Sequence, residues 1–334
     1  MERKDDMERK NKLIQSAQLI TDVCLDVAPG EDVLCIADDK ESMEVMTLVA
    51  EESRKKGANA SVVMIGLRKQ RYHEPPRSVV RAMVEADTVV NMVFGSLIHT
   101  NARKDACKAG VKFATVGGVT KKYLSRLNLT AEALLEVRAL TEKIAQLLTS
   151  ASSARLTTKA GTDLVMSLEA RNGVALVPFG KRGTFCVVPH YAEAACAPIE
   201  DSVEGVAVVD GTMVGGTNFE GPVEEPFRVY FEKGRIVNIS DGKDANRLKN
   251  ILVASGEEAR TFAELGVNSN HKIPKQLTGT RADNAIAGHV HIGLGRNDHI
   301  GGNSKGEIHL DVLVTRATLL LDGSPILKNG KLKI

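Results

Sequence analysis

ELGVNSNH (264–271), GHVHIGLGRNDHIGG (288–302) and EIHLD (307–311) contain five of the chain's eight histidines. Two patterns in this stretch, His289-Val290-His291 and His309-Leu310-Asp311, repeat a potential metal ligand at every second position. Residues i and i+2 of a strand point to the same face, so each pattern predicts two ligands side by side. The Gly-rich segment between them can turn the chain back, so both strands are expected to face one pocket. Imidazole and carboxylate together suit Zn, Mn, Co or Fe(II), although a lone His pair is also compatible with a purely structural role.

The composition is that of an ordinary globular protein of 334 residues, a length typical of two domains. A net charge of +2 and an aromatic content of 4% disfavour a nucleic-acid partner. The five cysteines are odd in number and form no CxxC pair, which favours reduced thiols and a cytoplasmic location. We expect neither a secretory signal nor a membrane span.

Residues 1–152 are predicted to form a doubly wound α/β domain with a parallel sheet. Apolar runs of strand length at 32–37, 60–65, 88–94 and 111–116 alternate with helical patterns at 10–28, 41–56 and 100–109. The turn after the first strand is ADDKES rather than GxGxxG, so the domain is Rossmann-like without a dinucleotide motif. A long helix over 130–150 precedes the Ser-rich boundary SASSAR.

Residues 153–334 are predicted to form a strand-rich α+β domain that carries the metal site. Short strands alternate with Gly turns, and one helix is expected over 242–254. Hairpins are predicted at Asp210-Gly211, Lys233-Gly234, Asp322-Gly323 and Asn329-Gly330. Glu264 is expected to follow a short amphipathic helix.

Further candidate residues lie outside the central stretch. His99 follows a strand of the first domain, where ligands of open α/β sheets bind, or it is an ordinary loop histidine. Glu193 lies among alanines, where a carboxylate needs a partner. Glu200 and Asp201 are interpreted as residues of a surface turn.

Taken in order, these motifs resemble the thermophilic-type metallo-aminopeptidases (aminopeptidase T and aminopeptidase S). The resemblance rests on Pro189–Pro198 with its internal Glu, Glu200-Asp201-Ser202, a Glu next to a Gly at 264–266, Gly288–Gly295, and the closing His-x-Asp. It covers most of the second domain and, more weakly, the first. It implies a two-metal site, with Zn, Co or Mn held by Glu193, Glu264, His291, His309 and Asp311.

The departures from that family concern the substrate more than the metals. Ala192 replaces a Gly before the first metal ligand, and Asp298, followed by His299, stands where the family has a catalytic Tyr. Asp283-Asn284 lies where the family tends to have a further acidic ligand.

A second branch of the same fold, the 2,5-dihydroxypyridine 5,6-dioxygenases, is similar in size. The shared features are Lys159–Asp163, the Glu-Asp-Ser motif, His99 and the His-Leu-Asp motif. This resemblance implies one Fe(II) and cleavage of a pyridine ring. Members of that branch lack the equivalents of Glu193 and His291, which this chain keeps.

The sequence therefore favours a metal-dependent hydrolase of a peptide or small amide that uses a metal-activated water. Glu264, His299, Asp298 and His99 are the candidate catalytic groups. His190, His289 and His271 are the candidate substrate-binding groups. The alternatives are a mononuclear Fe(II) ring-cleaving dioxygenase and a binding protein without activity. The resemblance also implies a homodimer.

Overall fold

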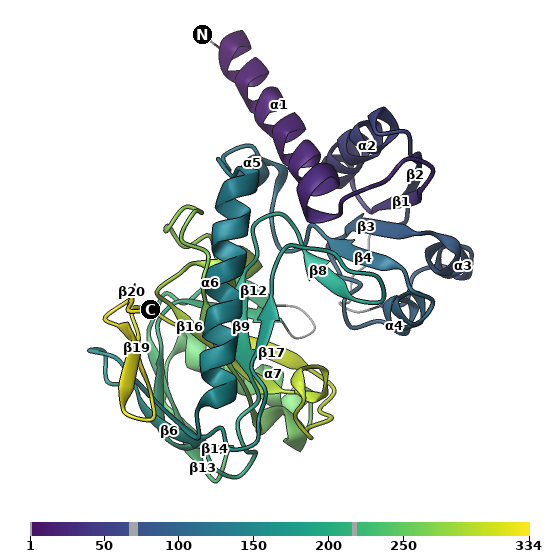
Figure 1. Cartoon of the computed structure of the whole chain (residues 1–334). Helices are drawn as coiled ribbons and strands as arrows, with labels where there is room; N and C mark the ends of the chain where they lie inside the picture. The colour runs from purple at the N-terminus through teal and green to yellow at the C-terminus, as the bar shows by residue number, and fades with distance from the viewer. Residues whose placement is uncertain (1, 67–72, 216–218) are drawn as a thin grey trace. The chain divides into compact units, whose positions relative to one another are not determined.

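The computed structural model describes residues 2–66, 73–215 and 219–334 of the chain (Figure 1). It is a mixed α/β structure with one parallel sheet and two antiparallel sheets, as expected for a two-domain α/β fold. The first compact unit comprises residues 1–135 and 177–191, and the second comprises 136–176 and 192–334.

The first unit is built on a parallel sheet in the order β2-β1-β3-β4-β8. Its strands are β1 (Asp32–Ala37), β2 (Asn59–Met64), β3 (Thr88–Met92), β4 (Lys112–Thr115) and β8 (Phe185–Val187). The helices are α1 (Glu2–Gln18, continued by a π-helical turn over Leu19–Cys24), α2 (Lys40–Lys55), α3 (Arg77–Glu85), α4 (Asn101–Lys108) and α5 (Lys121–Leu124). Helices α3 and α4 pack on one face of the sheet through Val79, Met83, Ala102 and Ala106. The predicted strands and helices of this region are present, and α3 is a helix that the sequence patterns did not predict.

The two units differ from the single expected boundary at residue 152. The chain returns to the first unit after α6 (Ala131–Ser150), because β8 adds to the parallel sheet beside β4. Most of α6 belongs to the second unit, since Ile144 and Leu148 are completely buried in that unit's core. Pairing between strands distant in sequence, rather than the Ser-rich segment, decides the division.

The second unit contains two antiparallel sheets that share one hydrophobic core. Sheet B has the order β14-β13-β10-β6-β5-β18-β19-β20, and sheet C has the order β12-β11-β17-β16-β15-β9-β7. Phe231 of sheet B and Phe262 of sheet C meet edge to face with ring centroids 5.3 Å apart. Helix α7 (Lys243–Ala254) adds Leu248 and Leu252 to this core.

The strands of sheet B are β5 (Ser153–Thr157), β6 (Asp163–Ser167), β10 (Glu204–Val209), β13 (Phe227–Glu232), β14 (Arg235–Ile239), β18 (Thr318–Leu321), β19 (Ser324–Lys328) and β20 (Lys331–Leu332). Those of sheet C are β7 (Val174–Leu176), β9 (Glu193–Cys196), β11 (Thr212–Gly215), β12 (Phe219–Pro222), β15 (Phe262–Asn268), β16 (Val290–Gly295) and β17 (His309–Val314).

Three of the four predicted hairpins are confirmed. Lys233-Gly234, Asp322-Gly323 and Asn329-Gly330 connect paired strands, and all six residues have positive φ, as tight hairpin turns require. The prediction at Asp210-Gly211 is wrong, because β10 pairs within sheet B whereas β11 pairs with β12 and β17 of sheet C. The Asp210 carboxylate accepts hydrogen bonds from the Thr315 backbone N–H and hydroxyl, both at 2.7 Å, which helps to fix this crossing between sheets.

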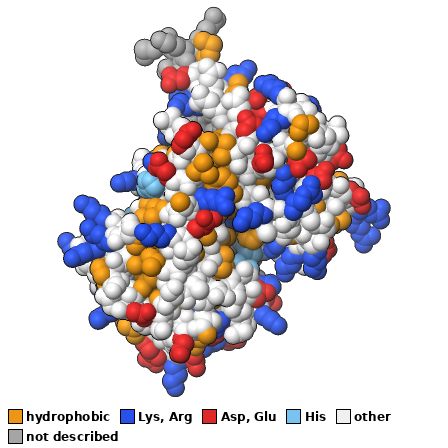
Figure 2. All heavy atoms as spheres, in the orientation of Figure 1, with side chains coloured by type: hydrophobic (Ala, Val, Ile, Leu, Met, Phe, Trp, Pro, Cys, Tyr) orange, Lys and Arg blue, Asp and Glu red, His pale blue; other side chains and the backbone are white. Residues whose placement is uncertain are grey.

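The surface charge on the face drawn in Figure 2 does not indicate a binding site. On the face shown in Figure 2, acidic and basic side chains are interspersed rather than gathered by sign. No helix in the described part of the chain is long and apolar enough to cross a membrane.

Candidate metal centre

The predicted ligands of the second unit lie on one face of sheet C. Strand residues alternate between faces, and Leu265, Val267, Ile292, Leu310 and Val312 point into the core shared with sheet B. The residues between them, Glu264, His291, His309 and Asp311, therefore occupy the opposite face. Glu264 lies inside β15, and the short helix expected before it is a 3₁₀ helix over Glu257–Arg260.

Strand pairing brings these side chains together from four neighbouring strands. Strand β16 pairs with β15 on one side and with β17 on the other, and β15 also pairs with β9, which begins at Glu193. His291 Nε2 lies 3.2 Å from Glu193 Oε2 and 3.5 Å from Glu264 Oε1. His309 Nε2 lies 3.0 Å from both Glu264 Oε2 and Asp311 Oδ1. The two oxygens of Glu264 thus face two different imidazoles.

Two glycines provide the space for this arrangement. A Cβ on Gly266 would lie 2.1 Å from His291 Cε1 and Nε2, and one on Gly293 would lie 2.7 Å from Glu264 Cβ and 2.8 Å from His309 Cε1. The ligand side chains consequently occupy the volume that a side chain at either position would need. The Glu-Leu-Gly and His-Ile-Gly spacings were visible in the sequence, but their steric role was not.

Hydrogen bonds to the far ring nitrogens orient both imidazoles. His309 Nδ1 lies 2.7 Å from the Arg296 carbonyl, which can only accept, so this nitrogen carries the proton. His291 Nδ1 lies 2.7 Å from Asn268 Oδ1, while the Asn268 amide nitrogen donates to the Asp283 carbonyl at 3.2 Å. Each ring therefore presents Nε2 to the carboxylates, which is how metal-binding histidines are usually held.

The buried carboxylates of the cluster favour positive charge beside them, as the pKa shifts of its members show. Burial opposes protonation of His291, but the nearby carboxylates, with Glu193 foremost, outweigh burial and raise the pKa of His291 to about 9. Burial is likewise outweighed at His309, where Asp311 and Glu264 raise the pKa well above its usual value. Burial favours the neutral form of Glu264, yet the two imidazoles hold its pKa well below the usual value. Protons and cations would satisfy the same buried carboxylates.

The donor set fits divalent metal ions. One possible ligand group is Glu193, Glu264 and His291, and a second is Glu264, His299 and His309, with the ligand atoms of each group within 4.8 Å of one another. Asp311 lies beside His309, and Asn284 donates to Asp311 Oδ2 at 2.8 Å. Asn284 Oδ1 is buried and has no hydrogen-bond donor among the described residues. An unused buried acceptor next to the cluster is consistent with a metal ion or its bound water in that place.

The other predicted residues of the second unit have different surroundings. Asp298 receives two hydrogen bonds from Arg296, at 2.5 and 2.6 Å. His289 lies just before β16 and accepts a hydrogen bond from the Arg316 backbone N–H at 3.2 Å, so of the two histidines in this motif only His291 belongs to a ligand group. His271 is 40% exposed and lies 4.0 Å from Glu136. A role for these three residues in catalysis or substrate binding stays a prediction.

His99 and His190 belong to the first unit. His99 lies half-buried in the loop after β3, as the sequence predicts. His190 is completely buried, 5.4 Å from the Tyr123 ring centroid, and burial lowers the pKa of His190 to about 3. This environment is that of a neutral histidine packed in the protein interior.

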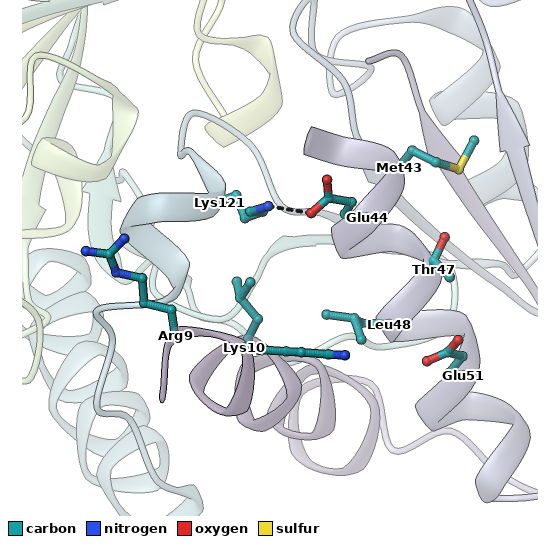
Figure 3. A pocket seen from close by; sticks show the side chains of 9 residues that line it. Arg9, Lys10, Met43, Glu44, Thr47, Leu48, Glu51 and Lys121 are labelled. Atoms are coloured by element: carbon teal, nitrogen blue, oxygen red, sulfur yellow. Dashed lines mark hydrogen bonds and ion pairs between the residues drawn. The ribbon is translucent and has the colours of Figure 1, made fainter. Parts of the chain in front are cut away.

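The first unit also contains a cavity of about 660 Å³ between α1, α2 and α5 (Figure 3). Its lining combines Leu13, Met43 and Leu48 with side chains of both charges, and Lys121 pairs with Glu44 at its edge. The described residues that line it include no imidazole and no group of metal ligands, so the cluster on sheet C is the stronger candidate for the site of chemistry.

A two-unit α/β chain with a buried cluster of carboxylates and imidazoles has the features of a metalloenzyme. The family model of the 2,5-dihydroxypyridine 5,6-dioxygenases (NicX) matches residues 13–334. The chain belongs to this enzyme family.

Two solved structures show the same fold. A 2,5-dihydroxypyridine dioxygenase from Pseudomonas putida KT2440 is 20% identical, with a TM-score of 0.81 and a match covering 96% of each chain. Wild-type AmpT from Thermus thermophilus is also 20% identical, with a TM-score of 0.70 and a match covering 97% of this chain and 100% of that chain. No curated protein sequence matches the chain. Both families that the sequence resembles are therefore represented among the structures with this fold. The family model favours the dioxygenase over the aminopeptidase.

Proposed function

We propose that the protein is a mononuclear Fe(II) dioxygenase that opens a hydroxylated, nitrogen-containing aromatic ring. The observation that carries this proposal is the ligand group of Glu264, His299 and His309. Two imidazoles and one carboxylate form the ligand set used by many non-haem Fe(II) oxygenases. Membership in the 2,5-dihydroxypyridine 5,6-dioxygenase family supports the same reaction class.

In this proposal the protein side chains hold the metal and manage protons. Bound Fe(II) would supply the redox chemistry that joins molecular oxygen to the ring. The Arg296 carbonyl keeps His309 Nε2 directed at the metal position. His291 and Glu193, 3.2 Å apart, form a buried acid–base pair that can accept the proton of a substrate hydroxyl. The side chains of Glu193, Glu264, His291 and His309 are at most 8% exposed, which limits the access of bulk water.

A second candidate function is hydrolysis of a peptide or small amide with two metal ions. The specific observation in its favour is the second ligand group, Glu193, Glu264 and His291, which shares Glu264 with the first. A shared carboxylate is the usual bridge between two metal ions that activate one water. In this case Zn, Co or Mn would be the expected metals, and Glu264 could also accept the water proton.

Elemental analysis of protein purified without chelator and without a His-tag separates the two functions. About one Fe per chain, with oxygen uptake on dihydroxypyridines, supports the dioxygenase. About two Zn, Co or Mn per chain, with turnover of aminoacyl amides or small cyclic amides, supports the hydrolase. Absence of metal, both as purified and after incubation with each ion, refutes both.

Three variants sharpen this test. His309→Ala should lose the single Fe of a dioxygenase or about half of the metal of a two-metal hydrolase, and wild-type metal content in this variant would contradict the assignment of the site. His291→Ala should keep the single Fe of a dioxygenase but lose about half of the metal of a two-metal hydrolase. His289→Ala is the matched control, because its ring contacts Arg316 rather than the ligand groups, and its metal content should equal that of the wild type.

The remaining expectations are part of the same proposal. We propose a small-molecule substrate, a cytoplasmic location and a homodimer without a nucleic-acid or membrane partner. Light scattering during gel filtration measures the oligomeric state directly, and a monomer at micromolar concentration would contradict the dimer.

A further inference from the structure

His299 differs from the other members of the two ligand groups in its structural setting. Glu193, Glu264, His291 and His309 lie on strands, whereas His299 lies in the loop 296–304, in a short 3₁₀ turn over Asp298–Ile300. Its ring meets that of His309 at 89°, with centroids 4.8 Å apart. A ligand on a loop is held less accurately than one on a strand unless the loop itself is fixed.

Asn297 holds the loop from the inside. The Asn297 side chain accepts a hydrogen bond from the Ser304 N–H at 2.7 Å and donates to the Ala263 carbonyl of β15 at 3.2 Å. A Cβ on Gly302 would lie 2.1 Å from the Asn297 amide carbon, so the loop closes tightly over this side chain. Ile300, next to His299, packs against Ala195 and Ala197.

Glu200 and Arg171 hold the loop from the outside. Arg171 Nη2 donates to Glu200 Oε2 at 2.5 Å, and its Nη1 donates to the Gly301 carbonyl at 3.0 Å. Glu200 Oε1 accepts a hydrogen bond from the Asn303 N–H at 2.7 Å. These hydrogen bonds therefore hold Gly301 and Asn303, the residues on either side of Gly302, to the segments that contain Arg171 and Glu200. Glu200 and Asp201 lie in a turn, as expected, but the Glu200 side chain is only 27% exposed and that of its partner Arg171 only 12%.

We propose that Glu200 and Arg171 are positioning residues that fix the loop 296–304, so that His299 is preorganised toward Glu264 and His309. This inference rests on the metal centre proposed above. The hydrogen bonds of Glu200 and Arg171 described above reach the loop and not the ligand groups. Their effect on the metal therefore passes through the loop backbone at Gly301 and Asn303. Charge-assisted hydrogen bonds are stronger than neutral ones and suit such a fixing role.

The test compares Glu200→Gln with Asp201→Asn, a matched control that removes the neighbouring, exposed carboxylate. Two quantities are measured in each protein: hydrogen exchange of the amides of residues 297–304 without metal, and the dissociation constant and visible spectrum of bound Co(II). Glu200→Gln should speed exchange in the loop by about tenfold or more and weaken Co(II) binding by roughly 10–100-fold, as is typical for groups that orient metal ligands. Asp201→Asn should match the wild type in both.

Two further variants protect the test against a simple folding defect. Arg171→Lys keeps the positive charge but cannot reach Glu200 and Gly301 together, so it should show a partial effect of the same sign. Gly302→Ala disturbs the loop directly and should reproduce both changes. Faster loop exchange with wild-type Co(II) affinity and spectrum would overturn the proposal, as would unchanged exchange in Glu200→Gln. Equal Co(II) binding by the wild type and His309→Ala would instead refute the metal centre itself.

Discussion

Gly266→Ala tests the geometry of the metal centre with a single methyl group. Gly266 does not have a positive φ, so alanine is compatible with its backbone. The added Cβ would lie 2.1 Å from His291 Nε2 and Cε1, where ordinary contacts begin at 3.4 Å. The imidazole would therefore have to move by about 1.3 Å, several times the tolerance of about 0.2 Å for metal–ligand distances.

The expected result is selective loss of the metal that His291 holds. Overpacking of this kind costs about 1–3 kcal/mol of unfolding free energy, so the variant should still fold. A two-metal centre should keep one ion, at Glu264, His299 and His309, and should lose on the order of 100-fold in affinity for the other. A mononuclear centre at those three residues should keep its ion, with reduced turnover because the acid–base pair of His291 and Glu193 is displaced.

Titration calorimetry gives the metal stoichiometry and affinity, and urea unfolding of metal-free protein gives the stability. Gly66→Ala is the control, because a Cβ there meets no described atom within 4 Å. Wild-type stability together with wild-type turnover and metal binding in Gly266→Ala would refute the placement of His291 against β15.

Three further predictions follow from the same structure. Asn268→Ala removes the acceptor of His291 Nδ1 and should weaken metal binding at His291 by roughly 10–100-fold, measured by the same titration; unchanged binding would show that the ring needs no such support. Burial opposes ionisation of Asp244, but hydrogen bonds from the Glu225 and Glu224 backbones and from Arg247 hold the pKa of Asp244 below its usual value. The ionised Asp244 carboxylate therefore stabilises the folded state above the unfolded-state pKa, and this stabilisation is lost as pH falls through the folded-state pKa. Asp244→Asn should accordingly cost about 2 kcal/mol in urea unfolding at pH 7 and less at pH 3, and an equal loss at both pH values would contradict this reasoning. Metal at 100 times its dissociation constant should raise the unfolding free energy by about 2.7 kcal/mol over chelator-treated protein, and identical thermal transitions with and without metal would argue against a specific site.

The choice between the two candidate functions depends on how Glu264 is used. Family membership favours the dioxygenase, whereas Glu193 and His291 complete a second ligand group on the same carboxylate. If only one ion binds, the second group is free for proton transfer. If two bind, Glu264 joins them. The stoichiometry of His291→Ala therefore decides more than the identity of the metal alone.

The sequence by itself determined the local features of this protein. The alternation of strands and helices predicted the parallel sheet, and three Lys-Gly, Asp-Gly and Asn-Gly pairs predicted real hairpins, because turn conformation depends on a few adjacent residues. The spacing in His309-Leu310-Asp311 placed both side chains on one face of a strand, where His309 Nε2 and Asp311 Oδ1 lie 3.0 Å apart.

Only the tertiary structure decided which distant residues meet. The same spacing in His289-Val290-His291 did not make a ligand pair, since β16 begins at Val290 and His289 bonds to the Arg316 backbone instead. Strand register placed Glu264 between two imidazoles. After Asp210 the chain enters sheet C, where β11 pairs with β17, instead of forming a hairpin with β10. A sequence pattern fixes the face on which a side chain lies, but its neighbours across the sheet depend on pairing between strands that are far apart in the chain.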